Sequence, residues 1–162
     1  TMVVDFIEKI MPQVWGSQPD VKVWIVGKDP PTALQSYAED PNVYVTGTVD
    51  DIRPYLRKAT ISASPIPYGV GIQNKVLEAM ACGTPVVASQ QAVSALDIQE
   101  DREVMVGHNP AEFAEKMLVL LESPEMRAAV GMAGRSYVER NHDWSVVAGK
   151  LAEVYEQTLT QM

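Results

Sequence analysis

Short apolar runs alternate with segments of helical periodicity along most of the chain. The runs are rich in valine and isoleucine, and most of them end at a glycine or begin after one. Several show little alternation of polar and apolar positions, which is typical of strands that are buried on both faces of a parallel sheet. The pattern predicts five strands, at residues 21–26, 43–46, 60–63, 85–88 and 103–106.

The segments around these runs carry apolar residues at helical spacing. Capping residues mark several of their ends. Asn109 and Glu112 have the spacing of a capping box, and Gly83 follows a helix as its C′ residue. The predicted helices cover residues 1–15, 50–55 and 72–82, followed by three that start at Asn109, Ser123 and Asp143.

This alternation of strands and helices predicts an α/β fold, a doubly wound parallel sheet with helices at the C-terminal end of the chain. No internal repeat or long linker divides residues 1–162, so we expect a single domain. Ligands of such sheets bind outside the carboxyl ends of the strands. The loops that follow the predicted strands are therefore the places to look for a site.

Composition narrows the function classes. The 162 residues are 46% hydrophobic and 21% charged, which is typical of a folded domain and argues against disorder. The net charge of −8 opposes binding to the phosphate backbone of nucleic acid, so a nucleic-acid partner is not expected. One cysteine cannot form a disulfide framework, and no apolar run approaches the length of a membrane span. These features predict a cytoplasmic location.

Residues 64–89 contain the most distinctive local pattern. A strand end leads into a loop rich in proline and glycine, then into a helix, a glycine and another strand. Gly69 and Gly71 allow the backbone to approach a ligand closely, and the free amides of the first helical turn favour an anion. On this helix we expect one face to be polar and the opposite face to pack in the core; the polar face holds Gly71, Asn74, Lys75 and Glu78, and the core face holds Ile72, Val76, Ala79 and Met80.

Two interpretations of Lys75 and Glu78 are open from the residues alone. The amides and Lys75 suit a diphosphate, and the Glu78 carboxylate suits a ribose diol, because both of its hydrogen bonds would be charge-assisted. The pair also has the spacing of a simple exposed ion pair on one helix face. The pattern by itself does not decide between a nucleotide site and a solvated surface.

The run from Gly71 to Ala88, with its Leu-Glu-Ala-Met-Ala-Cys-Gly-Thr-Pro-Val-Val core, resembles the C-terminal domain of the family-4 (group 1) glycosyltransferases, which have the GT-B architecture. The similarity extends to residues 45–59, 109–114, 121–127 and 142–144. The resemblance implies a Rossmann-like domain that binds the donor, a nucleoside diphosphate sugar, for a retaining transfer of the sugar to a glycan, lipid or other acceptor. Polysaccharide biosynthesis is the implied setting.

The resemblance also implies roles for particular residues. Glu78 matches the glutamate that holds the nucleotide ribose, and Lys75 is a candidate for stabilising the leaving group. The family's other glutamate falls on Val70, so this chain departs from the pattern there, and no catalytic residue is assigned with certainty. The remaining expected donor contacts come from the glycine-rich loop, the helix start and the loop beside the base: Gly69, Val70, Gly71, Ile72, Gln73, Asn74, Thr48 and Val49.

Residues 1–15 resemble the helix that follows the opening strand of the family's C-terminal domain. This implies a longer enzyme in which an acceptor-binding domain, that strand and a basic loop precede Thr1. We expect the fragment alone to be inactive and prone to self-association, and the whole enzyme to touch membranes only peripherally. Another GT-B enzyme, such as a nucleotide-sugar epimerase, and a non-catalytic nucleotide-binding module are the alternatives.

Other residue types that often carry chemistry have simpler interpretations here. Asp50 and Asp51 could suggest a metal site, but their position before a helix favours capping. The two histidines have no partner at the spacing of metal ligands, and Cys82 has no histidine nearby to activate it. We therefore expect no metal and no cofactor, with the nucleotide sugar acting as substrate.

Overall fold

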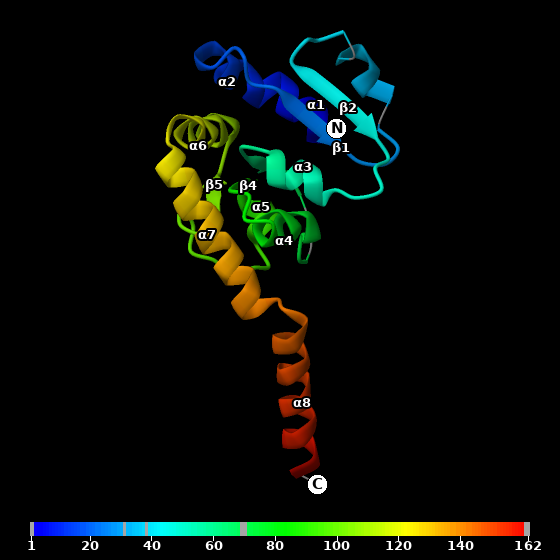
Figure 1. Ribbon diagram of the computed structural model, residues 1–162, viewed down its shortest axis with the longest axis vertical. Coiled ribbons are helices and arrows are strands. Elements are labelled where there is room, and N and C mark those ends of the chain that lie inside the picture. The colour runs from blue at the N-terminus through cyan, green and yellow to red at the C-terminus, as the bar shows by residue number, and fades with distance from the viewer. Residues whose placement is uncertain (1, 31, 38, 69–70, 161–162) are drawn as a thin grey trace.

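The computed structural model describes residues 2–30, 32–37, 39–68 and 71–160 (Figure 1). The described chain opens with a helical segment made of α1 (Met2–Asp5), the π-helical turn η1 (Phe6–Ile10) and α2 (Met11–Ser17). The strands of the described residues are β1 (Val23–Val26), β2 (Val43–Gly47), β3 (Ser62–Ser64), β4 (Val86–Ser89) and β5 (Met105–Gly107). The later helical elements are η2 (Thr32–Tyr37), α3 (Arg53–Lys58), α4 (Asn74–Ala81), α5 (Gln90–Val93), α6 (Pro110–Glu122), α7 (Pro124–Asn141) and α8 (Trp144–Thr160).

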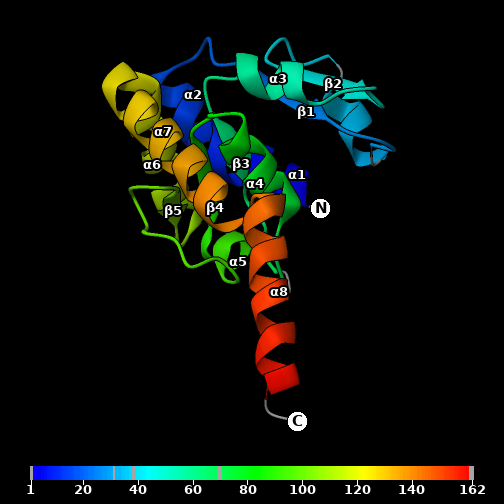
Figure 2. The ribbon, with the colours of Figure 1, turned by 60° about the horizontal axis from the view of Figure 1, so that its bottom comes forward.

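All strand pairs within the sheets are parallel, as the apolar runs predict. The strands do not form one sheet, however. β1 pairs with β2, and β4 lies between β3 and β5 in a separate three-stranded sheet. Figure 2 shows β1 and β2 set apart from the other three strands. The α/β class and the parallel strands are confirmed, and the expectation of one continuous sheet is corrected to two.

Two apolar clusters form the core. The first joins the N-terminal helices to α6, and the Phe6 and Phe113 rings meet in it edge to face with centroids 6.1 Å apart. The second lies beneath α4 and α7 and includes Val76, Met80 and Tyr137. Together the clusters fix α4 and α6 against the three-stranded sheet.

The predicted helix ends follow their capping residues. The Asn109 Oδ1 atom accepts from the Glu112 amide at 3.0 Å, and the Glu112 carboxylate accepts from the His108 amide at 3.0 Å. Ser123 Oγ accepts from the amide of Met126 at 3.1 Å. These bonds satisfy amides that a helix leaves without partners in its first turn.

Replacing Asn109 with alanine is expected to lower the free energy of unfolding by about 1 kcal/mol, because the first turn of α6 loses its side-chain acceptor. Urea denaturation of the two proteins measures this difference. Asn109→Asp is the matched control, since it keeps an acceptor at the same position and should stay within about 0.5 kcal/mol of the parent. Equal losses in both variants would contradict a capping role.

Some elements differ from the sequence-based predictions. The short elements η2 and α5 were not predicted, and α4 starts two residues later than expected. Trp24 is 57% exposed and Trp144 is 86% exposed, so neither lies in the core of the described chain. Helix α8 extends away from the rest of the molecule in both ribbon views (Figures 1 and 2). Among the described residues, no helix combines the length and the apolar character needed to cross a membrane.

Candidate functional site

Helix α4 presents Lys75 and Glu78. Val76, Ala79 and Met80 point into the core with exposed fractions of 1% or less, so the polar side chains of the same helix face solvent. The helix ends in a Schellman motif. Gly83, with φ of +74°, donates to the Met80 carbonyl at 2.8 Å, and Thr84 donates to the Ala79 carbonyl at 3.0 Å. The C-terminal end of α4 is thereby fixed against the next strand.

Within the described residues, the side chain of the N-cap residue leaves the N-terminal end of α4 uncapped. Gln73 is the N-cap residue, its backbone is extended, and its side chain makes no capping hydrogen bond. The first bond of the helix runs from the Val76 amide to the Gln73 carbonyl at 2.9 Å. The amides of Asn74 and Lys75 therefore precede the helical ladder and, with the helix dipole, favour an anion.

Gly71 explains why the helix starts late. Its φ of +78° is a left-handed conformation that glycine adopts without strain, and it places a turn before α4. Ile72 consequently lies outside the helix and is 50% exposed, so its expected position on the core face is wrong. The first helical turn, whose amides favour an anion, therefore begins at Asn74 and not at residue 72 as predicted.

Lys75 and Glu78 do not pair with each other. Both side chains are exposed, and neither takes part in an ion pair within the described part of the chain. The simple ion-pair interpretation of their spacing is therefore not what the structure shows. A cation and a carboxylate one helical turn apart remain available to a ligand.

Both residues line a cleft of about 610 Å³ that runs between the two sheets. Val26 at the carboxyl end of β1 and Ser64 at the carboxyl end of β3 line it together with Lys75 and Glu78. This end of the cleft is where ligands of parallel α/β sheets bind. The charged residues that line the whole cleft are Asp20, Lys22, Lys58, Lys75 and Glu78.

Lysines therefore outnumber acidic residues in the lining of the cleft, whereas acidic residues outnumber basic ones in the whole chain. Lys22 and Lys58 lie at the amino ends of the strands, and the sequence pattern gave no sign that they would meet this cleft. Lys22 is already engaged, because its Nζ atom donates to Asn42 Oδ1 at 2.6 Å. Lys75 is the cation at the carboxyl end.

The other residues predicted to contact the donor have a less direct relation to the cleft. Gly69 and Val70 lie outside the described residues. Gly71 is exposed and lies three positions before Asn74, the first residue of α4. Thr48 and Val49 follow the end of β2, but they are not among the residues that line the cleft, whereas Ile52 is.

Of the acidic pair before α3, Asp51 contacts the start of the helix. Asp51 Oδ1 accepts from the Arg53 amide and from its Nε atom, both at 2.9 Å. The Arg53 guanidinium and then its amide hold the pKa of Asp51 below the usual value. In the part of the chain that the structure describes, no group of three potential metal-ligating side chains is present.

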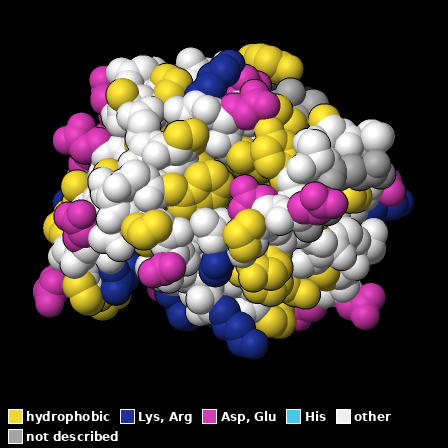
Figure 3. All heavy atoms as spheres, turned by 90° about the horizontal axis from the view of Figure 1, so that it is seen from above, with side chains coloured by type: hydrophobic (Ala, Val, Ile, Leu, Met, Phe, Trp, Pro, Cys, Tyr) yellow, Lys and Arg dark blue, Asp and Glu magenta, His cyan; other side chains and the backbone are white. Residues whose placement is uncertain are grey.

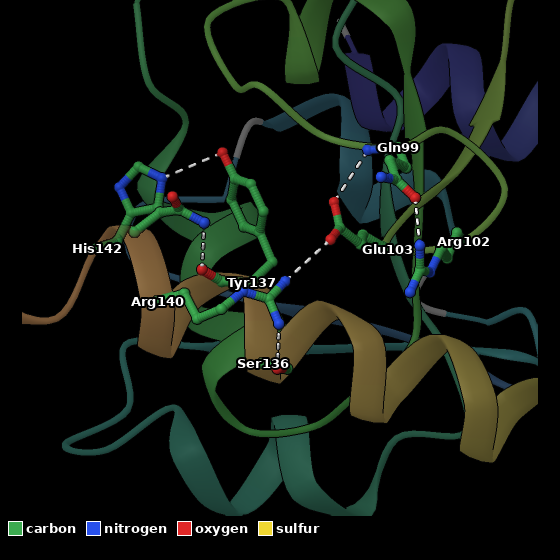
Figure 4. Close-up of polar contacts among 8 residues, drawn as sticks. Gln99, Arg102, Glu103, Ser136, Tyr137, Arg140 and His142 are labelled. Atoms are coloured by element: carbon green, nitrogen blue, oxygen red, sulfur yellow. Dashed lines mark hydrogen bonds and ion pairs between the residues drawn. The ribbon is translucent and has the colours of Figure 1, made fainter.

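A second polar cluster lies away from the cleft, between α7 and the segment before β5 (Figure 4). Glu103 is buried, and its carboxylate accepts from the Gln99 amide at 2.9 Å and from Arg140 Nη2 at 3.4 Å. Tyr137 is also buried, which raises the pKa of its phenol, and His142 lies 3.4 Å from its hydroxyl. Sequence reasoning placed Glu103 in a strand and missed this cluster, which joins residues 37 positions apart.

The surface seen from above carries no concentrated basic area (Figure 3). Lysine and arginine side chains are interspersed with acidic ones around a central group of hydrophobic atoms.

Comparison with known proteins identifies the family. A family model described as glycosyl transferases group 1 matches residues 2–123. The chain belongs to the group 1 glycosyltransferases. The matched residues include the Leu-Glu-Ala-Met-Ala run on α4, from which the sequence analysis inferred this family.

The group 1 relatives are longer proteins. A GDP-mannose-dependent monoacylated alpha-(1-6)-phosphatidylinositol monomannoside mannosyltransferase from Corynebacterium glutamicum is 31% identical over 166 residues, covering 94% of this chain and 43% of the relative. A phosphatidyl-myo-inositol mannosyltransferase from Mycobacterium leprae is 33% identical over 163 residues, covering 93% of this chain and 41% of the relative. This chain spans less than half the length of both relatives.

Solved group 1 and related structures share the fold. The C-terminal domain of LpcC from Francisella tularensis superposes with a TM-score of 0.74 at 17% identity, covering 89% of this chain and 81% of that domain. A TarM variant from Staphylococcus aureus, in complex with fondaparinux, alpha-GlcNAc-glycerol and UDP, superposes with a TM-score of 0.80 at 20% identity, covering 96% of this chain and 33% of TarM. At these low identities the superpositions show a shared fold and nothing beyond it.

Proposed function

We propose that this chain binds the nucleoside diphosphate sugar donor of a glycosyltransferase. The observation that carries the proposal is the placement of Lys75 and Glu78 on one exposed face of α4, unpaired with each other, at the carboxyl ends of β1 and β3. The diphosphate lies against the amides of Asn74 and Lys75 and the Lys75 ammonium group. The Glu78 carboxylate accepts hydrogen bonds from the ribose diol.

The donor we propose is GDP-mannose. Two mannosyltransferases match more than nine tenths of this chain, and the name of one states that it depends on GDP-mannose. The base lies beyond the ribose, on the side of the loop that holds Thr48 and Val49. The acceptor binds in the part of the longer enzyme that the relatives' additional length represents.

The reaction replaces the bond between the anomeric carbon and a phosphate oxygen with a bond between the same carbon and an acceptor oxygen. The bond from this carbon to the β-phosphate oxygen breaks, a bond to the acceptor oxygen forms, and the acceptor's proton passes to the departing phosphate. Negative charge therefore grows on the diphosphate as the bond breaks. Lys75 and the α4 amides are positioned to stabilise that charge, which is the electrostatic form of catalysis.

Replacing Glu78 with alanine is expected to weaken GDP binding at least tenfold, equivalent to about 1.4 kcal/mol, because the ribose diol loses a charged acceptor. Titration calorimetry of the parent and the variant with GDP, UDP and ADP measures the change. Glu115→Ala is the matched control, since Glu115 is an exposed glutamate on α6 that does not line the cleft.

Three outcomes of this titration would contradict the proposal. A parent chain that binds none of the three diphosphates at millimolar concentration argues for a module without a donor site. A Glu78→Ala variant that binds as tightly as the parent removes the ribose assignment. A preference for UDP or ADP over GDP overturns the guanosine assignment and leaves the diphosphate site in place.

A further inference from the structure

A buried hydroxyl connects two helices that both line the cleft. Thr84 is 4% exposed, and its Oγ1 atom donates to the Leu56 carbonyl at 2.7 Å. The two residues are 28 positions apart in the sequence. Thr84 belongs to the turn that ends α4, whereas Leu56 lies in α3. The bond therefore joins the helix that carries Lys75 and Glu78 to the helix that follows β2.

The Thr84 side of this bond is firmly held. The Thr84 amide donates to the Ala79 carbonyl at 3.0 Å within the Schellman motif, and β4 begins two residues later at Val86. Helix α7 packs against the same turn, since a Cβ atom at Gly131 would lie 2.4 Å from the Gly83 carbonyl oxygen. The hydroxyl is thus a fixed point from which α3 can be positioned.

Helix α3 has little support of its own. It is six residues long and has no fully buried residue. A helix this short depends on tertiary contacts for its stability. In the described chain, the β1–β2 pair that precedes it forms no ladder with the three-stranded sheet. Leu56 attaches α3 twice, because its side chain packs against the core cluster beneath α4 and its carbonyl accepts from Thr84.

The position of α3 determines one wall of the cleft. Ile52 is the N-cap residue of α3, and it lines the cleft together with Lys75 and Glu78. Thr48 and Val49 lie in the same connection, between the end of β2 and the start of α3. A displacement of α3 would therefore move the side expected to hold the base relative to the α4 groups expected to hold the ribose and the diphosphate.

We propose that Thr84 is a positioning residue of the donor site, whose hydroxyl fixes α3 and the loop before it relative to α4. This inference rests on the proposed donor site and adds the origin of its selectivity for the base. Thr84 is buried and is not among the residues that line the cleft, so it acts on the nucleotide through α3.

Thr84→Val is the test, because valine keeps the shape of threonine and removes the hydroxyl. Titration calorimetry with GDP, UDP and ADP gives the Kd of the favoured diphosphate and its ratio to the other two. We expect the favoured diphosphate to bind about fivefold more weakly and the other two to change less than about twofold, because only the favoured base gains from a correctly placed α3. A general loss of stability would weaken all three alike and leave the ratio unchanged.

Two controls separate the hydroxyl from its surroundings. Thr84→Ser restores the donor and should keep the parent's affinities within about twofold. Thr158→Val removes a hydroxyl of the same kind, since Thr158 Oγ1 donates to the Val154 carbonyl at 2.8 Å, but this bond is exposed and lies within α8. It should leave the ratio unchanged. If Thr84→Val does not fold, Leu56→Ala loosens the other attachment of α3 and takes the same measurement.

The outcomes distinguish this inference from the donor site itself. A parent chain that binds none of the diphosphates contradicts the donor site and, with it, the role of Thr84. A parent that discriminates among the bases, together with a Thr84→Val variant that keeps the same ratio, overturns the positioning role alone. Equal weakening of all three diphosphates does the same, because it assigns the bond to stability. A parent that binds the three diphosphates equally also overturns the role, since α3 then contributes no selectivity.

Discussion

Replacing Lys75 with alanine is expected to lower kcat of sugar transfer about a hundredfold in the enzyme that carries this domain, equivalent to about 2.7 kcal/mol of lost transition-state stabilisation. In the proposed reaction the ammonium group acts on charge that grows as the sugar leaves the diphosphate, so its removal should affect kcat much more than KM. Steady-state measurement of released GDP at varied GDP-mannose concentrations separates the two parameters.

Two controls make this prediction specific. Lys75→Arg keeps the positive charge and should retain most of the activity. Lys58→Ala removes a cation from the opposite end of the same cleft and should change kcat less than threefold, because solvent and salt screen a charge at that distance. A Lys75→Ala enzyme whose kcat is normal and whose KM alone is raised would show that Lys75 serves ground-state binding.

The Lys75 and Glu78 variants also distinguish the two halves of the nucleotide. With GDP and guanosine as ligands, Glu78→Ala should weaken the binding of both, because both contain the ribose diol. Lys75→Ala should weaken only GDP, because guanosine has no phosphate. The reverse pattern would place the diphosphate at Glu78 and contradict the proposed orientation of the donor on α4.

Replacing Gly131 with alanine is expected to lower the free energy of unfolding by about 3 kcal/mol, the upper end of ordinary overpacking effects. A Cβ atom at Gly131 would lie 2.4 Å from the Gly83 carbonyl oxygen. That oxygen belongs to the turn that ends α4, so it cannot move without disturbing the Schellman motif. Guanidinium denaturation monitored by circular dichroism measures the loss.

Gly149→Ala is the control for this substitution. Gly149 lies in α8, and a Cβ atom there meets no atom within 4 Å. Alanine is the better helix former, so this variant should be as stable as the parent or more stable by up to about 1 kcal/mol. A Gly131→Ala protein within about 0.5 kcal/mol of the parent would mean that α7 and α4 are packed less tightly than the structure shows.

The features that the sequence predicted well are encoded over a few residues. The Asn109–Glu112 capping box and the Gly83 helix end depend on residues three or four positions apart, and both occur where predicted. The apolar runs located the parallel strands to within about two residues, because burial on both faces leaves a continuous hydrophobic signal. The placement of Lys75 and Glu78 on one solvent-facing side of α4 follows from helical periodicity alone.

The features that the sequence did not predict depend on distant parts of the chain. Glu103 is buried because Arg140 and the Gln99 amide surround its carboxylate, and no local pattern links these residues. The separation into two sheets depends on which strands find partners across the fold. Ile72 has the right spacing for the core, but the turn at Gly71 removes it from the helix.

The Schellman turn and the buried face of α4 have a consequence for how this site can vary. Lys75 and Glu78 lie in the same α-helix. Adding a single residue between them would therefore rotate one side chain about 100° around the helix axis relative to the other. One of the two would then be driven into the apolar interior. Insertions or deletions before Gly71 would leave the spacing of the cation and the carboxylate on α4 intact.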